Sequence, residues 1–173
     1  MRKEPLVVAL SLVLALSLFD HGNVAHAQVI CSGHTRQLGW SVYGSDRGDL
    51  IDCSGSTANL VIIGLGGNDI LIGGRGRDVL IGGNGEDFLF GLDGNDFLNG
   101  GNDSDGLFGG GGDDTLKSGG GPDLLIGGSG RDALFGGDGD DVLFGGHGID
   151  LCDGQGGDDD YAGSDCEGPV NIP

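Results

Sequence analysis

The chain has 173 residues, 41 of them glycine, and a formal net charge of −19 at pH 7. Such acidity disfavours nucleic acid as a partner, because nucleic acids are polyanions. Glycine-rich, highly charged chains often stay disordered, since they bury too little apolar surface to offset the entropy lost on folding. In this chain, however, the charges recur at a strict period, and this regularity argues for a folded repeat.

Residues 1–27 are predicted to be a secretory signal peptide. Arg2 and Lys3 precede an apolar run at residues 6–19, and the small-residue pattern Ala25-His26-Ala27 follows it. The run is shorter than the ~20 residues that a membrane-spanning helix needs. We therefore expect cleavage after Ala27, bacterial export of the mature chain to the extracellular space, and no transmembrane segment after cleavage.

Residues 28–63 come next and contain an imperfect lead-in repeat at residues 44–52, after which residues 55–63 interrupt the register. The open end of a repeat array exposes a core layer and unpaired strand edges, which invite aggregation unless a cap covers them. We therefore predict that residues 28–63 form an N-terminal cap and that residues 163–173 form a C-terminal one.

Between these segments, residues 64–162 repeat with a period of nine, and we number the units 1 to 11 from Gly64. Glycine fills the fourth place of every unit except unit 5, where Asp103 stands. Leucine fills the eighth place of nine consecutive units, before Cys152 and Tyr161 replace it. The sixth place is aspartate in all eleven units: Asp69, Asp78, Asp87, Asp96, Asp105, Asp114, Asp123, Asp132, Asp141, Asp150 and Asp159.

Each unit therefore predicts a tight turn followed by a strand of about three residues. Glycine suits the turn because it adopts positive φ without steric cost. Strands this short are unstable unless similar neighbours stack on them, so a solenoid is the expected architecture. The leucine of each unit would face inward and build a continuous core.

The repeat resembles G-G-x-G-x-D-x-U-x, the nonapeptide of the RTX, or hemolysin-type, calcium-binding repeat family. The resemblance implies an all-β fold, a right-handed parallel β-roll (β-solenoid) in which two units make one turn. It also implies that calcium ions lie between the turns of units n and n + 2, so that Asp69 pairs with Asp87. The eleven sixth-place aspartates are then the candidate metal ligands, together with carbonyl oxygens of the turns.

The donor types also favour calcium. Carboxylates and carbonyls are hard oxygen ligands, and calcium accepts six to eight of them at variable geometry. Zinc is disfavoured, because the mature chain has only His34 and His147 and its cysteines lack C-x-x-C spacing. We expect the roll to fold on binding multiple calcium ions, with weaker sites around Asp105, where Asp103, Gly106 and Ser118 depart from the consensus.

Four cysteines lie beyond the signal peptide, in the part of the chain that reaches an oxidising compartment. They allow three pairings. Eleven units make about five and a half turns, which at ~4.8 Å per strand separate the two ends by about 25 Å, too far for a disulfide. Pairing within each end is therefore favoured, as Cys31 with Cys53 and Cys152 with Cys166.

The function predicted for the chain is non-enzymatic, since the short segments flanking the array leave no room for a catalytic domain. We expect an extracellular calcium-binding module with a structural or adhesive role. The alternative is an accessory module that recognises an exported protein or a polysaccharide. A protein or cell-surface partner is favoured by an apolar ladder on the outside of one sheet, formed at the ninth place by Ile72, Phe90, Phe108, Ile126 and Phe144.

Overall fold

The computed structural model describes residues 28–31, 40–157 and 159–166, so the predicted signal peptide lies outside the described residues. Turns and short apolar stretches alternate along the described chain, and they produce fifteen strands and no helix. None of the described segments is thus a helix that could cross a membrane. The strands are β1 Gln28–Ile30, β2 Trp40–Tyr43, β3 Leu50–Asp52, β4 Leu60–Gly66, β5 Ile70–Ile72, β6 Val79–Asn84, β7 Phe88–Asp93, β8 Phe97–Asn102, β9 Gly106–Gly111, β10 Thr115–Gly120, β11 Leu124–Gly130, β12 Ala133–Asp138, β13 Val142–Gly148, β14 Leu151–Gly156 and β15 Tyr161–Ala162.

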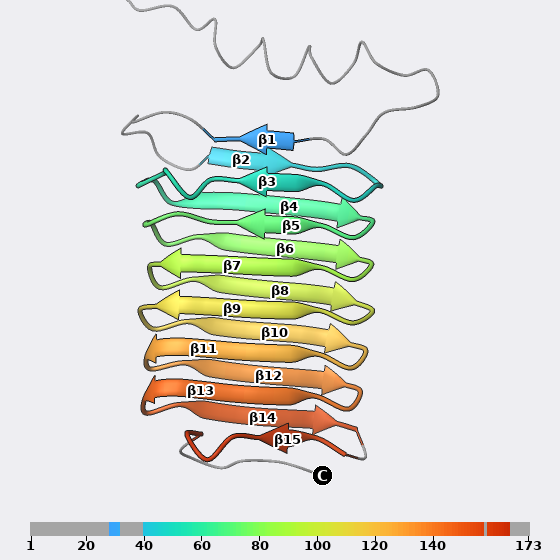
Figure 1. Ribbon diagram of the computed structural model, residues 1–173, viewed down its shortest axis with the longest axis vertical. Helices are drawn as coiled ribbons and strands as arrows, with labels where there is room; N and C mark the ends of the chain where they lie inside the picture. The colour runs from blue at the N-terminus through green and yellow to red at the C-terminus, as the bar shows by residue number, and fades with distance from the viewer. Residues whose placement is uncertain (1–27, 32–39, 158, 167–173) are drawn as a thin grey trace, which may run out of the picture.

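The strands form two parallel sheets, as Figure 1 shows. Odd-numbered strands make an eight-stranded sheet in the order β1-β3-β5-β7-β9-β11-β13-β15, and even-numbered strands make a seven-stranded sheet from β14 to β2. The chain crosses from one sheet to the other at every turn, which is the path of a β-solenoid. The predicted all-β parallel class is therefore confirmed.

The strand register measures the length of each solenoid turn. Val79 pairs with Phe97 across β6 and β8, a spacing of two nonapeptides. Trp40 pairs with Leu60, so a turn near the N-terminus is longer by two residues. Strands β1 to β4 continue both sheets of the array towards the N-terminus. The fifteen strands of the described residues, at two per turn, make about seven turns rather than the five and a half expected.

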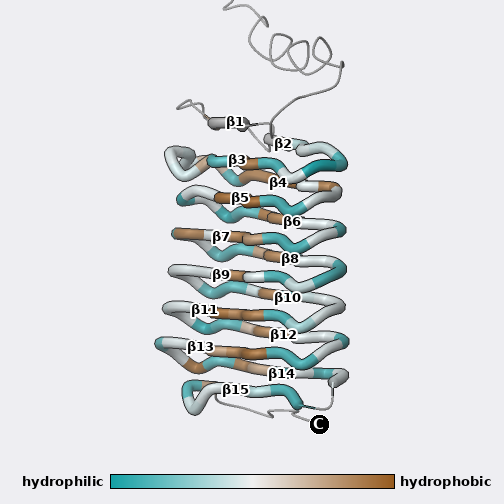
Figure 2. The backbone as a smooth tube through the Cα atoms, turned by 45° about the vertical axis from the view of Figure 1, so that its right-hand side comes forward, coloured by the Kyte–Doolittle hydropathy of each residue, from teal (hydrophilic) through white to brown (hydrophobic). Residues whose placement is uncertain are grey.

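The core is a single file of inward side chains, one from each central strand. The eighth-place leucines of units 1 to 9 are all fully buried. Ile51 and Ile62 extend this file towards the N-terminus, and Cys152 extends it towards the C-terminus. Figure 2 shows the resulting pattern, in which hydrophobic residues occupy strand centres and hydrophilic residues gather at the turns.

The last unit departs from the predicted register. Val142 pairs with Tyr161 and Leu143 with Ala162, so the final turn contains one extra residue. Ala162 therefore takes the inward place assigned to Tyr161, whose side chain is 54% exposed. The shift has a physical reason, since a tyrosine in the file would bury its hydroxyl group, which needs a hydrogen-bond partner when buried.

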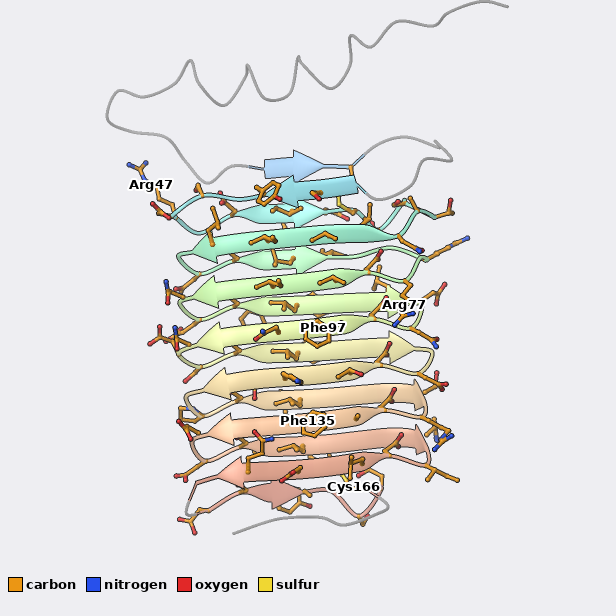
Figure 3. The ribbon with its side chains drawn as sticks, turned by 180° about the vertical axis from the view of Figure 1, so that it is seen from behind. Arg47, Arg77, Phe97, Phe135 and Cys166 are labelled. Atoms are coloured by element: carbon orange, nitrogen blue, oxygen red, sulfur yellow. A yellow bond between two sulfur atoms is a disulfide. The ribbon has the colours of Figure 1, made fainter. Side chains whose placement is uncertain are left out.

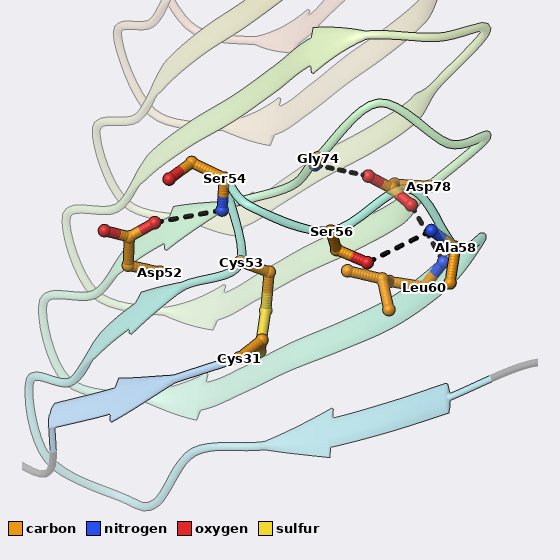
Figure 4. The surroundings of a disulfide bond; sticks show 9 residues. All are labelled: Cys31, Asp52, Cys53, Ser54, Ser56, Ala58, Leu60, Gly74 and Asp78. Carbon is orange, nitrogen blue, oxygen red and sulfur yellow. Dashed lines mark hydrogen bonds between the residues drawn. A yellow bond between two sulfur atoms is a disulfide. The ribbon is translucent and has the colours of Figure 1, made fainter. Parts of the chain in front are cut away.

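Both favoured disulfides are present. Cys31 and Cys53 join β1 to the segment after β3, with a Cα–Cα distance of 4.6 Å (Figure 4). Cys152 and Cys166 join β14 to the segment after β15 at 5.7 Å. Each bond thus ties one end of the described solenoid to its neighbouring turn.

Candidate metal centre

The sixth-place aspartates form two ladders, one along each edge of the solenoid. The turns of odd-numbered units lie at one edge, which we call the odd edge. The turns of even-numbered units lie at the opposite edge, which we call the even edge. Along each edge, the carboxylate oxygen Oδ1 of an aspartate accepts a hydrogen bond from the main-chain N–H at the same place one turn earlier. Asp69 donates in this way to Asp87, and Asp78 to Asp96. All eleven such bonds measure 2.7–2.9 Å.

The turns stack closely enough to require glycine. Gly112, at a fourth place, has a φ of 122°, and a side chain there would collide with the carbonyl of Gly94 in the turn below. At the first place, a Cβ added to Gly91 would lie 2.5 Å from Oδ2 of Asp96 and 2.6 Å from the carbonyl oxygen of Gly109. The carboxylate and the next turn's carbonyl thus converge over the first-place α-carbon.

The second carboxylate oxygen of these aspartates has no donor. Oδ2 is buried and without a hydrogen-bond partner in ten aspartates of the described chain, whereas a buried acceptor normally has one. An unpaired buried carboxylate oxygen that faces a carbonyl is unfavourable unless a proton or a cation lies with it. The ten residues are Asp69, Asp87, Asp96, Asp105, Asp114, Asp123, Asp132, Asp141, Asp150 and Asp160.

Burial shifts the acidity of the ladder towards neutral pH. Desolvation raises the pKa of Asp69, Asp105, Asp114 and Asp141 to about 7. It also raises the pKa of Asp87, Asp96 and Asp132 to about 6, and that of Asp78 and Asp123 in the same direction. Neighbouring carboxylates add to the effect, as Asp87 does for Asp69. Protons would therefore compete with any metal cation for these oxygens near neutral pH.

The donor set fits calcium. Among the described residues, no three side chains of His, Cys, Asp or Glu come together as a metal cluster. A cation between two turns must therefore take many of its ligands from backbone carbonyls, with one or two carboxylates completing the set. Calcium accepts six to eight such oxygens at variable geometry, whereas magnesium demands a strict octahedron and zinc prefers nitrogen and sulfur.

The structure brings ten of the eleven predicted aspartates into the ladders and leaves Asp159 outside them. Asp159 is exposed, and Asp160 takes the equivalent place, where its Oδ1 accepts the N–H of Asp141 at 2.9 Å. The extra residue in the last turn causes this shift. Asp49, in the lead-in repeat, also belongs to the odd-edge ladder, because its N–H donates to Asp69 at 2.7 Å.

The two ladders begin with aspartates that already have donors. Both oxygens of Asp78 are satisfied, Oδ1 by the N–H of Leu60 at 2.8 Å and Oδ2 by the N–H of Gly74 at 2.7 Å (Figure 4). Oδ2 of Asp49 accepts from the N–H and the hydroxyl of Ser45 at 2.6 and 3.0 Å. Sequence spacing does not distinguish Asp78 from the other ladder residues. The Gly74 N–H is directed at Asp78 by the neighbouring segment at residues 53–59, and the spacing of the aspartates carries no information about that segment.

The fold and its edges define a parallel β-roll with buried oxygen acceptors between successive turns. The sequence profile of the RTX calcium-binding nonapeptide repeat matches four stretches in two overlapping pairs, residues 63–98 with 81–116 and residues 118–152 with 126–161, which together span more than half of the chain. The chain therefore belongs to the RTX calcium-binding nonapeptide repeat family. No curated protein and no solved structure matches it significantly.

Proposed function

We propose that the protein is a secreted calcium-binding module whose roll folds as several calcium ions bind between its turns. One observation carries the proposal, namely the ten buried Oδ2 atoms without a donor, which repeat along both edges at the spacing of one turn. The sixth-place aspartates would hold the ions, with Asp160 in place of Asp159, and turn carbonyls would supply the other ligands. Bound calcium would neutralise the carboxylates and draw neighbouring turns together.

Calcium binding and folding are coupled in this proposal. Without a cation, the folded chain must bury a row of carboxylates in each edge, and its net charge of −19 opposes compaction. The unfolded chain hydrates the same groups and does not assemble the sites. A ligand that binds only the folded state stabilises that state by mass action, so calcium would shift the equilibrium towards the roll.

The proposed setting is extracellular. The predicted signal peptide directs export, and two disulfides fit an oxidising compartment. A solenoid pinned at both described ends, with ions along its edges, would be a stiff element suited to a structural or adhesive role. Extracellular modules bind calcium at about 10⁻⁴ to 10⁻³ M, so external calcium would control its folding. No catalytic activity is part of the proposal.

The outer face of the eight-stranded sheet supports a second candidate function, the binding of an exported protein, a cell surface or a polysaccharide. Ile70 and Phe88 are 40% and 49% exposed on this face. The rings of Phe90 and Phe108 stack beside them, with centroids 4.8 Å apart. Apolar side chains that line several neighbouring strands mark an interaction surface more often than scattered ones do.

The seven-stranded sheet presents a different outer face. Lys117 lies on it with its ammonium group 6.0 Å from the ring centre of Phe97 and 5.6 Å from that of Phe135. Figure 3 shows both phenylalanines on this sheet. Because the cation covers the aromatic surface between β8 and β12, a partner would find its apolar contacts on the eight-stranded sheet.

A calcium titration tests the main proposal. The disulfide-bonded protein, stripped of calcium, is followed by far-ultraviolet circular dichroism while bound ions are counted by calorimetry. A cooperative gain of β-structure with several calcium ions per chain supports the proposal. Magnesium at the same concentration is the control and is expected to produce a weaker response. A spectrum that calcium does not change would overturn the proposal.

A further inference from the structure

Ser118 breaks the first-place pattern of the array. The other ten units begin with glycine, and Ser118 alone places a side chain where the carboxylate and the next turn's carbonyl converge. It lies on β10 at the start of unit 7, whose turn belongs to the odd edge. Its side chain is fully buried. The space that glycine leaves beside the aspartate in the other units is therefore occupied in this one.

The Ser118 hydroxyl has a specific partner. It donates to the carbonyl of Gly136, the first residue of unit 9, at 2.6 Å. It also lies close enough to the carboxylate of Asp123, in its own unit, to lower the pKa of that group, although burial raises this pKa overall. A hydroxyl has one hydrogen to donate, and this hydrogen goes to Gly136, so Oδ2 of Asp123 has no donor, as in nine other ladder aspartates. What distinguishes this junction is that its carbonyl already accepts a hydrogen bond from a side chain. The equivalent carbonyl of Gly109 faces Oδ2 of Asp96 with no hydroxyl beside it.

We propose that Ser118 closes the junction between the turns of units 7 and 9 with a hydrogen bond and excludes calcium from it. This inference rests on the proposed function, since it concerns which junctions accept ions. Two physical effects act together. First, the Cβ and Oγ of Ser118 fill the space into which the ligands of a cation would have to move. Second, the hydrogen bond occupies the carbonyl oxygen of Gly136, which would otherwise be available to an ion.

The consequence is an interrupted row of ions at the odd edge. Calcium would bind in the junctions before unit 7 and after unit 9, while the even edge, where every unit begins with glycine, would carry an unbroken row. The odd edge would be held together at this level by the Ser118–Gly136 bond. The opposite possibility is that the hydroxyl oxygen is itself a calcium ligand, and the two possibilities predict opposite changes in the ion count.

The test is a count of bound calcium by native mass spectrometry on the full disulfide-bonded protein at saturating calcium. Ser118→Gly restores the glycine of the other units and is expected to bind one more ion than the wild-type protein. Ser118→Ala keeps a β-carbon and removes the hydroxyl, and its count is expected to match the wild type. If both variants bound one more calcium ion than the wild type, the hydroxyl group alone would be responsible for excluding calcium. This result would also support the inference.

Gly127→Ser is the matched control in the next turn, at the even edge. A Cβ at Gly127 would lie 2.5 Å from Oδ2 of Asp132 and 2.6 Å from the Gly145 carbonyl, so this variant is expected to lose one ion. Circular dichroism in calcium checks that each variant folds, and if Gly127→Ser does not, the two Ser118 variants still decide. An unchanged or lower count in Ser118→Gly would overturn the inference. A wild-type protein that binds no calcium would instead overturn the proposed function.

Discussion

The main-chain N–H of Asp96 donates to Oδ1 of Asp114 at 2.8 Å, while Oδ2 of the same carboxylate is buried without a donor. One oxygen of Asp114 thus holds two turns together, and the other makes the contact unfavourable when the group is ionised. Desolvation raises the pKa of Asp114 to about 7 for this reason. Substitution of Asp114 is therefore expected to change two properties that can be measured separately, the stability of the calcium-free roll and its affinity for calcium.

Asp114→Asn is expected to stabilise the calcium-free roll and to weaken calcium binding. The amide keeps an oxygen for the Asp96 N–H, removes the buried charge and offers a donor near the Gly127 carbonyl. The gain should be about 1 kcal/mol, the net value of one hydrogen bond. Folding of the calcium-free protein by an osmolyte, followed by circular dichroism, measures the stability, and calorimetry measures the affinity.

Asp78→Asn is the control for this substitution. Both oxygens of Asp78 already accept N–H groups, so an amide would place one donor against another. The calcium-free roll is therefore expected to lose stability in Asp78→Asn, the reverse of the effect at Asp114. Equal effects of the two substitutions would show that the unpaired oxygen of Asp114 is not the source of the instability.

The calcium-free roll is expected to be more stable in mild acid than at pH 8. Folding raises the pKa of Asp105 from 3.8 to about 7 and that of Asp96 to about 6. A group whose folded pKa is raised contributes stability that is complete below the unfolded pKa and is lost as pH rises through the folded pKa. Circular dichroism without calcium should therefore show β-structure fading between about pH 4 and pH 7, and β-structure that instead increases with pH would contradict this expectation.

Calcium should reverse this dependence by displacing protons. Binding to the folded, calcium-free roll at pH 6 is expected to release protons, because the ladder aspartates would have to lose them to bind calcium as carboxylates. Calorimetry in two buffers of different ionisation enthalpy measures the release, which should disappear at pH 8.5. Proton release that is the same at both pH values would mean that groups other than these aspartates titrate on binding.

Asp160 and Asp159 provide a direct test of the corrected register. Asp160→Ala removes the acceptor of the Asp141 N–H and a buried carboxylate, so it is expected to lower the calcium count by one and to destabilise the last turn. Asp159→Ala changes an exposed residue and should leave the count unchanged. Native mass spectrometry distinguishes them, and a loss of calcium confined to Asp159→Ala would restore the strict nine-residue register.

The C-terminal disulfide is expected to stabilise the calcium-bound roll. Cys152 and Cys166 are 14 residues apart, and closing a loop of this length contributes about 3 kcal/mol in the chain-entropy model. Cys152→Ala with Cys166→Ala should therefore lower the free energy of unfolding by about that amount. Urea unfolding at saturating calcium measures the change, and a difference well below 1 kcal/mol would show that the ions alone hold this end.

The apolar outer face can be tested by introducing charge. Phe90→Asp with Phe108→Asp removes the aromatic stack from the eight-stranded sheet and should abolish self-association or partner binding there. Thr115→Asp, on the seven-stranded sheet, is the control. Light scattering coupled to size exclusion measures particle mass in calcium. An unchanged mass together with unchanged capture of cell-surface protein would mean that the apolar ladder serves only to stabilise the sheet.

Much of this architecture could be predicted because two features of the fold, the core position and the turn position, recur in the sequence with a period of nine. The eighth-place leucines mark the core and the sixth-place aspartates mark the turns. The resemblance to the RTX repeat adds two units per turn, from which the facing of Asp69 with Asp87 follows. The pairing of Cys152 with Cys166 follows as well, since the array keeps its two ends apart.

Three features could not be predicted from spacing. Three consecutive aspartates at residues 158–160 leave the last register undetermined, and only the pairing of Leu143 with Ala162 rather than with Tyr161 settles it. Strands β1 and β2 belong to the same two sheets but pair with β3 and β4 at spacings longer than two nonapeptides, which a search for nine-residue units overlooks. The donors to Asp78 depend on how residues 53–59 pack against Gly74.

The aspartate ladder has a direction. Each turn offers an N–H group, and the following turn in the sequence brings the carboxylate that accepts it, as Asp123 does for Asp105 and Asp141 does for Asp123. In a chain that folds from its N-terminus, the N–H donors of each turn are therefore satisfied by carboxylates in the order in which the turns are added. Every new turn supplies the acceptor for the N–H group of the turn before it, so the roll can grow turn by turn from its N-terminal end.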